Sequence, residues 1–422
     1  IFEIAPNNAS LTNDQINSVL DRALQSDDFS NKRILLILPD ATRTAPIGPL
    51  FKGIHERLHR RVEALDLIIA LGTHPPLSES AICQRLEITP SQRHEKYSDV
   101  RFYNHEWNNP AALEHIGTIP ADEINLLSGG LFSMDVQVEI NSIYRNYDIL
   151  LVIGPVFPHE VVGFSGGNKY FFPGIAGPRI LNFFHWLGAV VTNPMIIGNK
   201  WTPVRKVVDR AASLIPRQRL CFAAVVDEKR FAGLFFGTPE SAWDSASDLS
   251  AQIHITRKPH PFHTVLSCAP PMYDELWVAG KCMYKLEPVV ADGGELIIYA
   301  PHLEEISTTH GHLIRKIGYH CRDYFLKQWD RFKHYPWGVL AHSTHVHGIG
   351  TYENGIEQRR ILVTLATRIP PEVCHQINLG WRNPDSIRIE DFADREDQGI
   401  LLVPKAGERL FHLQQKPAWA GG

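Results

Sequence analysis

A glycine-rich segment with one lysine and two flanking histidines is the most informative part of the sequence. The segment spans residues 163–177 and includes Lys169, while His159 lies just before it and His185 just after it. An imidazole titrates near neutral pH, so it can accept and return protons, and it also binds metals. An apolar run over residues 148–154 predicts a buried strand in front of the segment. This composition predicts an active site with a charged ligand and with acid/base or metal chemistry.

Two common nucleotide-binding loops do not fit this segment. A Walker A loop needs Gly-Lys followed by Ser or Thr, whereas Lys169 is followed by Tyr170. The dinucleotide fingerprint fails because Gly163, Gly166 and Gly167 have the wrong spacing. A helix is predicted directly after the segment, and the backbone N–H groups at its start suit a phosphate. A tight loop with a solvated lysine stays open as the alternative.

Two further groups of polar residues follow apolar runs of strand length. Residues 33–38 end just before Asp40 and Arg43, and residues 64–71 end just before His74. Taken singly, a capping aspartate, a surface arginine and a loop histidine are the ordinary interpretations. Ligands bind at the carboxyl ends of strands in open α/β sheets, so three such strand ends together favour a shared site.

These residues resemble the nickel-dependent lactate racemase family and its 2-hydroxyacid racemase and epimerase homologues. The resemblance rests on Asp40-x-x-Arg43, Gly72-Thr73-His74, His159 with the Gly163–Lys169 motif, Pro173-Gly174-Ile175, His185, residues 275–281 and residues 292–294. It covers residues 33–300, and more loosely the chain beyond them.

The resemblance implies a cofactor and the residues that hold it. Family members use a nickel-pincer nucleotide, pyridinium-3-thioamide-5-thiocarboxylic acid mononucleotide, attached covalently to a lysine that matches Lys169. The remaining planar position of the nickel belongs to a histidine that matches His185, and an imidazole suits a square-planar nickel with sulfur donors. Asp40 matches a residue that holds the nucleotide. Further cofactor contacts are expected from Thr42, Thr73, Phe164, Ser165, Gly166 and Gly167.

The resemblance also implies roles in catalysis. His74 and His159 match a pair of acid/base histidines, one for each enantiomeric face, and Arg43 and Lys281 match the cationic partners of the substrate. The chemistry is consistent with these roles. The C2 hydrogen of a 2-hydroxy acid is barely acidic, but its removal as hydride, while a base takes the hydroxyl proton, gives a neutral ketone. Two cations can hold the carboxylate while the keto group rotates.

One departure from the family concerns the substrate. Lactate-specific members carry a glutamine three residues before the matching lysine, whereas this chain has Val278 there and Trp277 before it. We therefore expect a polyhydroxy (sugar) acid rather than lactate, with Trp277 either at the substrate or in ordinary core packing.

A cluster of His342, His345 and His347 provides a rival interpretation. On a strand, His345 and His347 would share one side, and such spacing can bind zinc or iron in a hydrolase or lyase. A polar loop that contacts substrate hydroxyls is the favoured interpretation of these residues. A second alternative is a non-catalytic protein that binds a sugar acid or another anion.

Composition limits the class of protein. The chain has 422 residues, 44% hydrophobic content, a net charge of −4 and six cysteines without a CxxC motif. We expect a soluble, cytoplasmic enzyme without a nucleic-acid or membrane partner, because its charge attracts neither, no apolar run reaches transmembrane length and the N-terminus lacks a signal pattern. The expected partners are a small 2-hydroxy acid, cofactor-biosynthesis proteins for loading and, as a possibility, further copies of the chain.

The predicted fold class is α/β, with two α/β domains, mostly parallel sheets and an active site in the cleft between the domains. Residues 1–260 form the cofactor-binding catalytic domain and residues 261–422 an α/β domain that contributes substrate contacts. A polar linker is expected over residues 245–258, and a helix over residues 273–291 in the second domain. Further helices are predicted at residues 13–24 and 179–190, with strands at residues 221–226, 231–236, 263–268 and 295–300.

Overall fold

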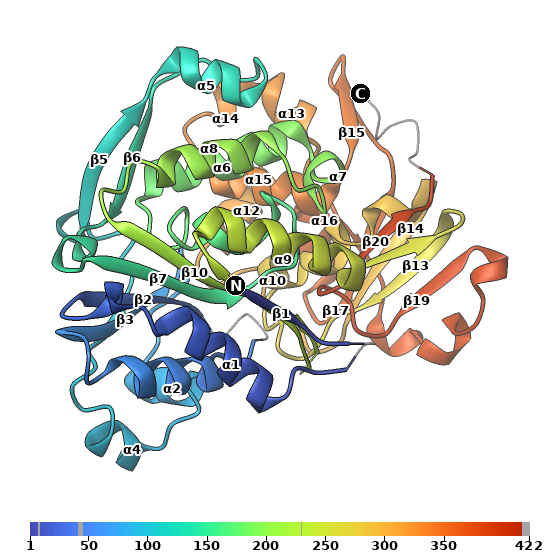
Figure 1. Ribbon diagram of the computed structural model, residues 1–422. Helices are drawn as coiled ribbons and strands as arrows, with labels where there is room; N and C mark the ends of the chain where they lie inside the picture. Colours follow the sequence, from blue (N-terminus) through green and yellow to red (C-terminus); the bar gives the residue numbers. More distant parts are fainter. Residues whose placement is uncertain (7–8, 41–44, 229, 416–422) are drawn as a thin grey trace. The chain divides into compact units, whose positions relative to one another are not determined.

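The computed structural model describes residues 1–6, 9–40, 45–228 and 230–415 (Figure 1). Two of the predicted site residues, Thr42 and Arg43, lie outside the described residues. The chain divides into two compact units. Unit 1 comprises Ile1–Phe157, Phe164–Leu181 and Arg205–Ile253, and unit 2 comprises Pro158–Gly163, Asn182–Val204 and the chain from His254 onward. The domain boundary at residue 260 stays a prediction.

A seven-stranded sheet forms the centre of unit 1, in the order β1-β11-β10-β7-β2-β3-β4. The five strands from β10 to β4 are parallel, and β11 and β1 are added antiparallel at the edge. Continuous apolar runs such as residues 34–38, all fully buried, explain why these strands lie inside the sheet. The bounds are β1 Phe2–Ile4, β2 Arg33–Pro39, β3 Ala64–Ala70, β4 Phe102–Asn104, β7 Ile149–Pro155, β10 Gln218–Asp227 and β11 Arg230–Gly237. A separate antiparallel pair is β5 Leu113–Ile119 with β6 Val136–Asn141.

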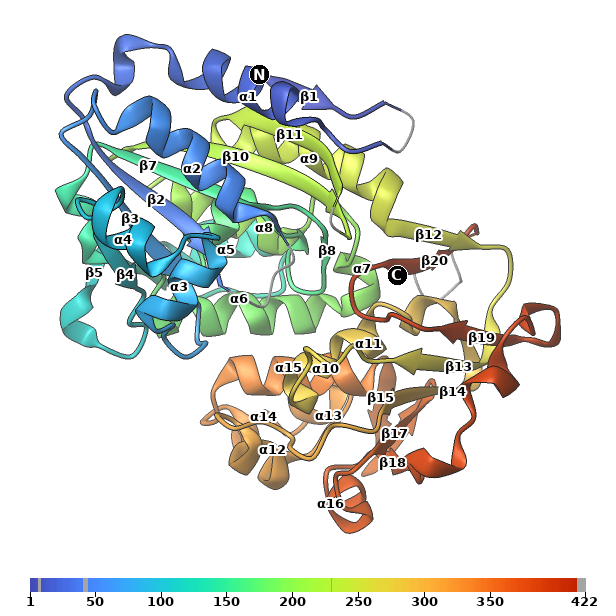
Figure 2. The ribbon, with the colours of Figure 1, turned by 90° about the horizontal axis from the view of Figure 1, so that it is seen from below.

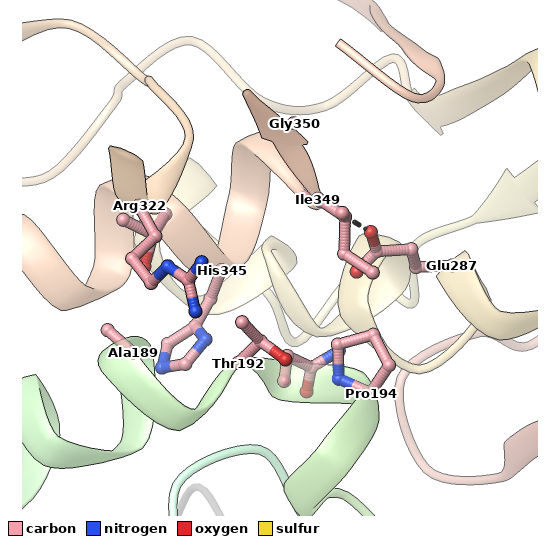
Figure 3. Close-up of a pocket in the computed structure, with 11 residues that line it drawn as sticks. Ala189, Thr192, Pro194, Glu287, Arg322, His345, Ile349 and Gly350 are labelled. Atoms are coloured by element: carbon pink, nitrogen blue, oxygen red, sulfur yellow. Dashed lines mark hydrogen bonds between the residues drawn. The ribbon is translucent and has the colours of Figure 1, made fainter. Parts of the chain in front are cut away.

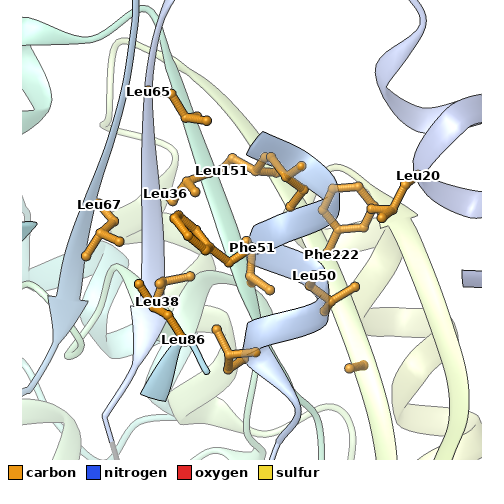
Figure 4. Packing of buried hydrophobic residues seen from close by; sticks show 14 of the residues in the cluster. Leu20, Leu36, Leu38, Leu50, Phe51, Leu65, Leu67, Leu86, Leu151 and Phe222 are labelled. Atoms are coloured by element: carbon orange, nitrogen blue, oxygen red, sulfur yellow. The ribbon is translucent and has the colours of Figure 1, made fainter. Parts of the chain in front are cut away.

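Helices cover both faces of this sheet. Leu20 of α1 and Phe51 of α2 pack with Leu36, Leu151 and Phe222 of the strands in one hydrophobic cluster (Figure 4). Helices α8 and α9 lie on the other face (Figure 1). The helices are α1 Asn13–Leu24, α2 Ile47–Leu58, α3 Glu79–Arg85, α4 Pro90–Glu95, α5 Ala121–Ser128, α6 Pro178–Val191, α8 Pro203–Ala212 and α9 Pro239–His254. Of these, α6 continues into unit 2.

Unit 2 contains a five-stranded, wholly parallel sheet in the order β18-β17-β14-β13-β19 (Figure 2). The bounds are β13 Phe262–Cys268, β14 Val290–Ala300, β17 Leu362–Thr367, β18 Gly380–Trp381 and β19 Ile400–Val403. Two pairs flank it, β12 Ile255–Lys258 with β20 Leu410–Leu413 and β15 Gly350–Glu353 with β16 Ile356–Arg359. The helices are α7 Asn193–Ile196, α10 Leu276–Ala279, α11 Lys281–Tyr284, α12 Gly311–Ile317, α13 Arg322–Leu326, α14 Trp329–Phe332, α15 Trp337–His347 and α16 Pro371–Gln376.

Short elements complete the chain. The 3₁₀ turns are η1 Asp27–Phe29, η2 Pro110–Ala112, η3 Ser142–Asn146, η4 Gly167–Tyr170, η5 Glu287–Val289, η6 Pro384–Ser386, η7 Ile389–Phe392 and η8 Glu396–Gln398, and the two-residue strands are β8 Pro158–His159 and β9 Gly163–Phe164. None of the helices in the described part of the chain has the length and apolar character needed to cross a membrane.

The mostly parallel α/β fold is confirmed, and α1 has the predicted bounds. Two local predictions were wrong. The expected linker at residues 245–258 is the end of helix α9 followed by strand β12, because Ala246, Ser247 and Ser250 are buried along one helix. The expected helix at residues 273–291 is broken into α10, α11 and η5.

Candidate active site

In unit 1 the strand ends bring an aspartate and a histidine together. Strands β7, β2 and β3 are parallel neighbours, so their carboxyl ends lie at one edge of the sheet. Asp40 directly follows β2 and is 6% exposed, and His74 lies in the half-buried loop after β3 beside Thr73. His74 Nδ1 forms a short contact with Asp40 Oδ2. A carboxylate that accepts the Nδ1 proton leaves Nε2 of the ring free to act on a substrate.

Backbone hydrogen bonds tie the turn with Lys169 to the loop with His74, also within unit 1. The Gly174 N–H donates to the carbonyl oxygen of Lys169 (3.1 Å), and the Gly72 N–H donates to the carbonyl oxygen of Gly174 (3.0 Å). Lys169 is half-buried in η4. Asp40, His74 and Lys169 therefore belong to one connected part of unit 1.

Tight packing explains the glycines of this segment. Gly166 has φ +87°, and a Cβ there would lie 2.6 Å from the Val156 side chain. A Cβ on Gly174 would lie 2.2 Å from the carbonyl oxygen of Tyr170. Larger residues cannot adopt this turn without displacing the backbone.

Other predicted cofactor residues are engaged inside unit 1. The Ser165 hydroxyl donates to the Pro155 carbonyl (3.1 Å) and accepts from the Phe157 N–H (3.0 Å). Phe164 and Gly167 are buried. These contacts hold the segment in place, and their roles toward a cofactor stay predictions.

In unit 2, His159 and His345 both interact with the acidic residue Glu160. His159 is 5% exposed; its Nδ1 accepts from the Val161 N–H (3.1 Å) and lies 3.3 Å from Glu160 Oε2. His345 of α15 interacts electrostatically with both Glu160 and His185 of α6. His185, the predicted nickel ligand, and Glu160, the neighbour of the predicted acid/base residue His159, thus both act on the buried imidazole of His345.

The predicted substrate lysine also belongs to unit 2. Lys281 lies on α11, and its Nζ is 5.0 Å from the centre of the Tyr273 ring. Trp277 of α10 stacks on His342, with ring centres 3.8 Å apart and planes at 9°, and its carbonyl oxygen accepts from His342 Nε2 (2.9 Å). Val278, next to Trp277, is half-buried. Trp277 thus has a packing role within unit 2.

The interpretation of residues 342–347 as a strand or a polar loop was wrong. His342, His345 and His347 lie on helix α15 and are buried. On a helix His342 and His345 lie on one face, whereas His347 points to a different side, which explains why the three do not converge on one ion. Among the described residues no group of three or more His, Cys, Asp or Glu side chains is placed to hold a metal. The zinc or iron site proposed for a hydrolase or lyase at His342, His345 and His347 is therefore not supported.

A cavity of about 50 Å³ lies within unit 2, at the carboxyl ends of α6 and α15 (Figure 3). Arg322 borders it and donates to the carbonyl oxygen of Val190 (3.0 Å). Three lining residues, Asn193, Glu287 and His345, each have a buried polar atom with no hydrogen-bond partner among the described residues. A water molecule needs about 10–15 Å³ of such volume, so the cavity can hold several that would satisfy these atoms.

The buried histidines of α15 predict a loss of stability in mild acid. Burial lowers the pKa of His342 to about 3 and those of His345 and His347 to about 4, from 6.5. Below pH 6.5 the unfolded chain takes up protons that the folded chain cannot, so the stabilisation is complete above pH 6.5 and is lost as pH falls. We expect the free energy of unfolding to drop by about 1 kcal/mol per histidine between pH 7.5 and 5.5.

Urea denaturation at these two pH values measures the effect. His342→Gln keeps a donor for the Trp277 carbonyl but cannot titrate. The proton uptake on unfolding, given by the slope of the unfolding free energy against pH, should therefore be about one proton smaller than in the parent protein. An equal slope in the variant and the parent would show that His342 is not buried in its neutral form.

The first part of the chain resembles lactate racemases in sequence. The model of the lactate racemase N-terminal domain matches residues 5–195. The lactate racemase of Thermoanaerobacterium thermosaccharolyticum is 24% identical over 302 residues, which are 70% of this chain and 65% of that protein. The lactate racemase of Lactiplantibacillus plantarum is 22% identical over 291 residues, 67% of this chain and 64% of that protein. The chain thus matches slightly less than two thirds of the length of these curated relatives.

Two solved structures resemble the chain over nearly its whole length. A Thermotoga maritima protein has a TM-score of 0.87 and 31% identity, and the match covers 96% of this chain and 99% of that one. The lactate racemase apoprotein from T. thermosaccharolyticum has a TM-score of 0.70 and 18% identity, with 96% and 94% covered, and this likeness shows the fold. Residues 5–195 thus resemble the lactate racemase N-terminal domain, and the fold resembles that of the lactate racemase apoprotein.

Proposed function

We propose that the protein is an isomerase that inverts C2 of a small 2-hydroxy acid. The observation that carries the proposal is the contact of Asp40 with His74, joined through backbone hydrogen bonds to the turn of Lys169. An imidazole held by a carboxylate and a half-buried amine, both in this connected part of unit 1, supply an acid/base group and an attachment point. The similarity to lactate racemases supports the same reaction class.

The available donors fit a covalently attached nickel-pincer nucleotide. Lys169 would offer the amine and His185 one imidazole as a nickel ligand, and a Cβ added to Gly72, two residues before His74, would meet no atom of the described residues within 4 Å. Asp40, Thr73 and the glycines of residues 163–177 would line the nucleotide. When bound, the group supplies an acceptor for the C2 hydrogen. Loading would require cofactor-biosynthesis proteins, and a cytoplasmic location suits such a pathway.

The residues of the chain itself would move the hydroxyl proton and hold the acid. His74 accepts the proton when one enantiomer reacts and His159 accepts it for the other, each returning it in the reverse direction. Asp40 keeps the proton of His74 on Nδ1, so that Nε2 faces the substrate. Lys281 binds the carboxylate together with Arg43, which lies outside the described residues.

The general test is a panel of 2-hydroxy acids assayed by chiral chromatography with cofactor-loaded protein. Interconversion of at least one acid, together with nickel and an added mass on the chain, supports the proposal. Binding of acids without any interconversion by the loaded protein would instead favour a non-catalytic sugar-acid-binding protein.

Within this panel we expect a higher kcat/KM for gluconate than for lactate. The reason is Val278, whose side chain cannot hydrogen-bond the substrate, at the position where the resemblance to lactate racemases implies a glutamine in lactate-specific members. The contribution expected from His345 and His347 falls away because both are buried on α15. Val278→Gln should raise the lactate-to-gluconate ratio of kcat/KM about ten-fold, the scale of one hydrogen bond. Equal efficiency for lactate and every longer acid would contradict the proposed substrate class.

A further inference from the structure

Asn168, the residue before Lys169, is the centre of a buried hydrogen-bond network in unit 1. Its side chain is 0% exposed. Asn168 Nδ2 donates to Asp209 Oδ1 (3.0 Å) and to Glu240 Oε1 (2.8 Å). Asn168 Oδ1 accepts from Arg219 Nη1 (2.8 Å), which also donates to Glu240 Oε1 (2.9 Å). Helices α8 and α9 and strand β10 are therefore all tied to the turn that carries Lys169.

Only an amide satisfies all three partners. One NH₂ group serves two carboxylates while the amide oxygen serves a guanidinium, and neither an ionised carboxylate nor an alkyl side chain can do both. Burial raises the pKa of Asp209. Burial also acts to raise the pKa of Glu240, but the hydrogen bonds from Asn168 and from the Glu240 backbone, together with Arg219, lower it overall. The amide thus stabilises the negative charge of Glu240.

A second buried group holds the residues in front of the turn. Arg205 Nη2 donates to the carbonyl oxygen of Phe164 (2.5 Å) and Nη1 donates to that of Gly166 (3.4 Å). The guanidinium lies over the Trp243 ring at 4.1 Å. The polypeptide that leads to Lys169 is consequently held by Arg205 in front of the turn and by the Asn168 network within it.

We propose that Asn168 is a positioning residue for Lys169. Adjacent residues of a 3₁₀ turn share their backbone placement, so the anchored amide determines where the lysine side chain begins. Fixing the backbone beforehand leaves only side-chain freedom to be lost when a ligand is attached. The inference rests on the proposed function for the identity of that ligand, but the placement of Lys169 can be measured without it.

The test measures acetylation of lysines in cofactor-free protein with an N-hydroxysuccinimide acetate reagent, by peptide mass spectrometry. Lys206, exposed on α8 in the same unit, is the internal reference. For Asn168→Ala we expect the Lys169-to-Lys206 labelling ratio to rise about five-fold, because a turn that is no longer held opens more often. An unchanged ratio in a variant that is folded at the assay temperature, as judged by circular dichroism, overturns the proposal.

Two further variants separate positioning from general stability. Asn193→Ala removes another buried asparagine, whose Nδ2 donates to the Tyr284 carbonyl (2.9 Å) in unit 2. It should lower the melting temperature without changing the ratio, and a similar rise there would also overturn the proposal. If Asn168→Ala does not fold, Asn168→Ser is the substitute, because serine keeps one hydroxyl donor. Its Lys169-to-Lys206 labelling ratio should lie above that of the parent protein, with a rise of less than about five-fold. Absence of a cofactor adduct on Lys169 in loaded protein would refute the proposed function and leave this ratio unaffected.

Discussion

Lys169→Ala is expected to abolish both the covalent adduct and the interconversion of 2-hydroxy acids. Lys169 is the one lysine of residues 163–177, and its backbone hydrogen bonds do not depend on the side chain. The fold should therefore persist while turnover falls by more than about 1,000-fold, the scale seen when one member of a catalytic unit is removed. Intact mass, nickel content and a racemisation assay on the same preparation measure the three properties.

Lys206→Ala is the matched control for this prediction, since it removes an exposed lysine of the same unit. It should keep the adduct and the activity. Retention of the adduct mass in Lys169→Ala would place the attachment on another residue. His185→Ala should instead keep the adduct but lose nickel, because it removes a donor to the metal and leaves the lysine in place; unchanged nickel content would count against His185 as a ligand.

Replacing either acid/base histidine should stop interconversion in both directions. Each turnover needs one imidazole to accept the hydroxyl proton and the other to return it, so His74→Ala and His159→Ala should each lose about 10²- to 10⁴-fold in kcat from either enantiomer. Initial rates starting from each pure enantiomer give the measurement. A variant that loses only one direction would be inconsistent with a two-base mechanism.

Asp40→Asn tests whether the carboxylate acts through His74. The amide keeps the shape of the side chain but no longer favours the Nδ1–H form of the ring, so kcat should fall while the variant stays folded. His115→Ala, which removes an exposed histidine of unit 1, is the control and should leave kcat unchanged. Normal kcat in Asp40→Asn would assign the aspartate to another task, such as binding the nucleotide alone.

The sequence predicted the parts of the site that depend on local order. Apolar runs before Asp40, before His74 and before the glycine-rich segment predicted parallel strands, and β2, β3 and β7 are adjacent parallel strands. Because the carboxyl ends of parallel strands share one edge of a sheet, the order of the strands along the chain was enough to expect Asp40 and His74 at the same edge. Their direct contact was not predicted, although the two strand-end positions were the signal for it.

Other features depended on contacts between distant segments. Nothing in the sequence singled out Asn168 within the glycine-rich segment. Its hydrogen-bond partners Asp209 and Glu240 lie 41 and 72 residues further along the chain, and they make it the centre of a buried hydrogen-bond network. The helix α15 was missed because its three histidines suggested a polar segment, whereas tertiary burial and the stack of His342 on Trp277 make the imidazoles part of the interior. The expected linker became a helix for the same reason.

What the sequence determined by itself was the α/β class, the strands that present Asp40 and His74, and the types of reactive residue, because hydrophobic periodicity and side-chain chemistry are local properties. Only the tertiary structure decided which polar groups are paired and which are buried. Hydrogen bonding and desolvation depend on what packs around a group, and the neighbours of Asn168 and His342 come from elements far away in the chain. Because desolvation depends on the surrounding residues, a histidine can lie at the surface in one place and, like His342, be a buried neutral imidazole in another.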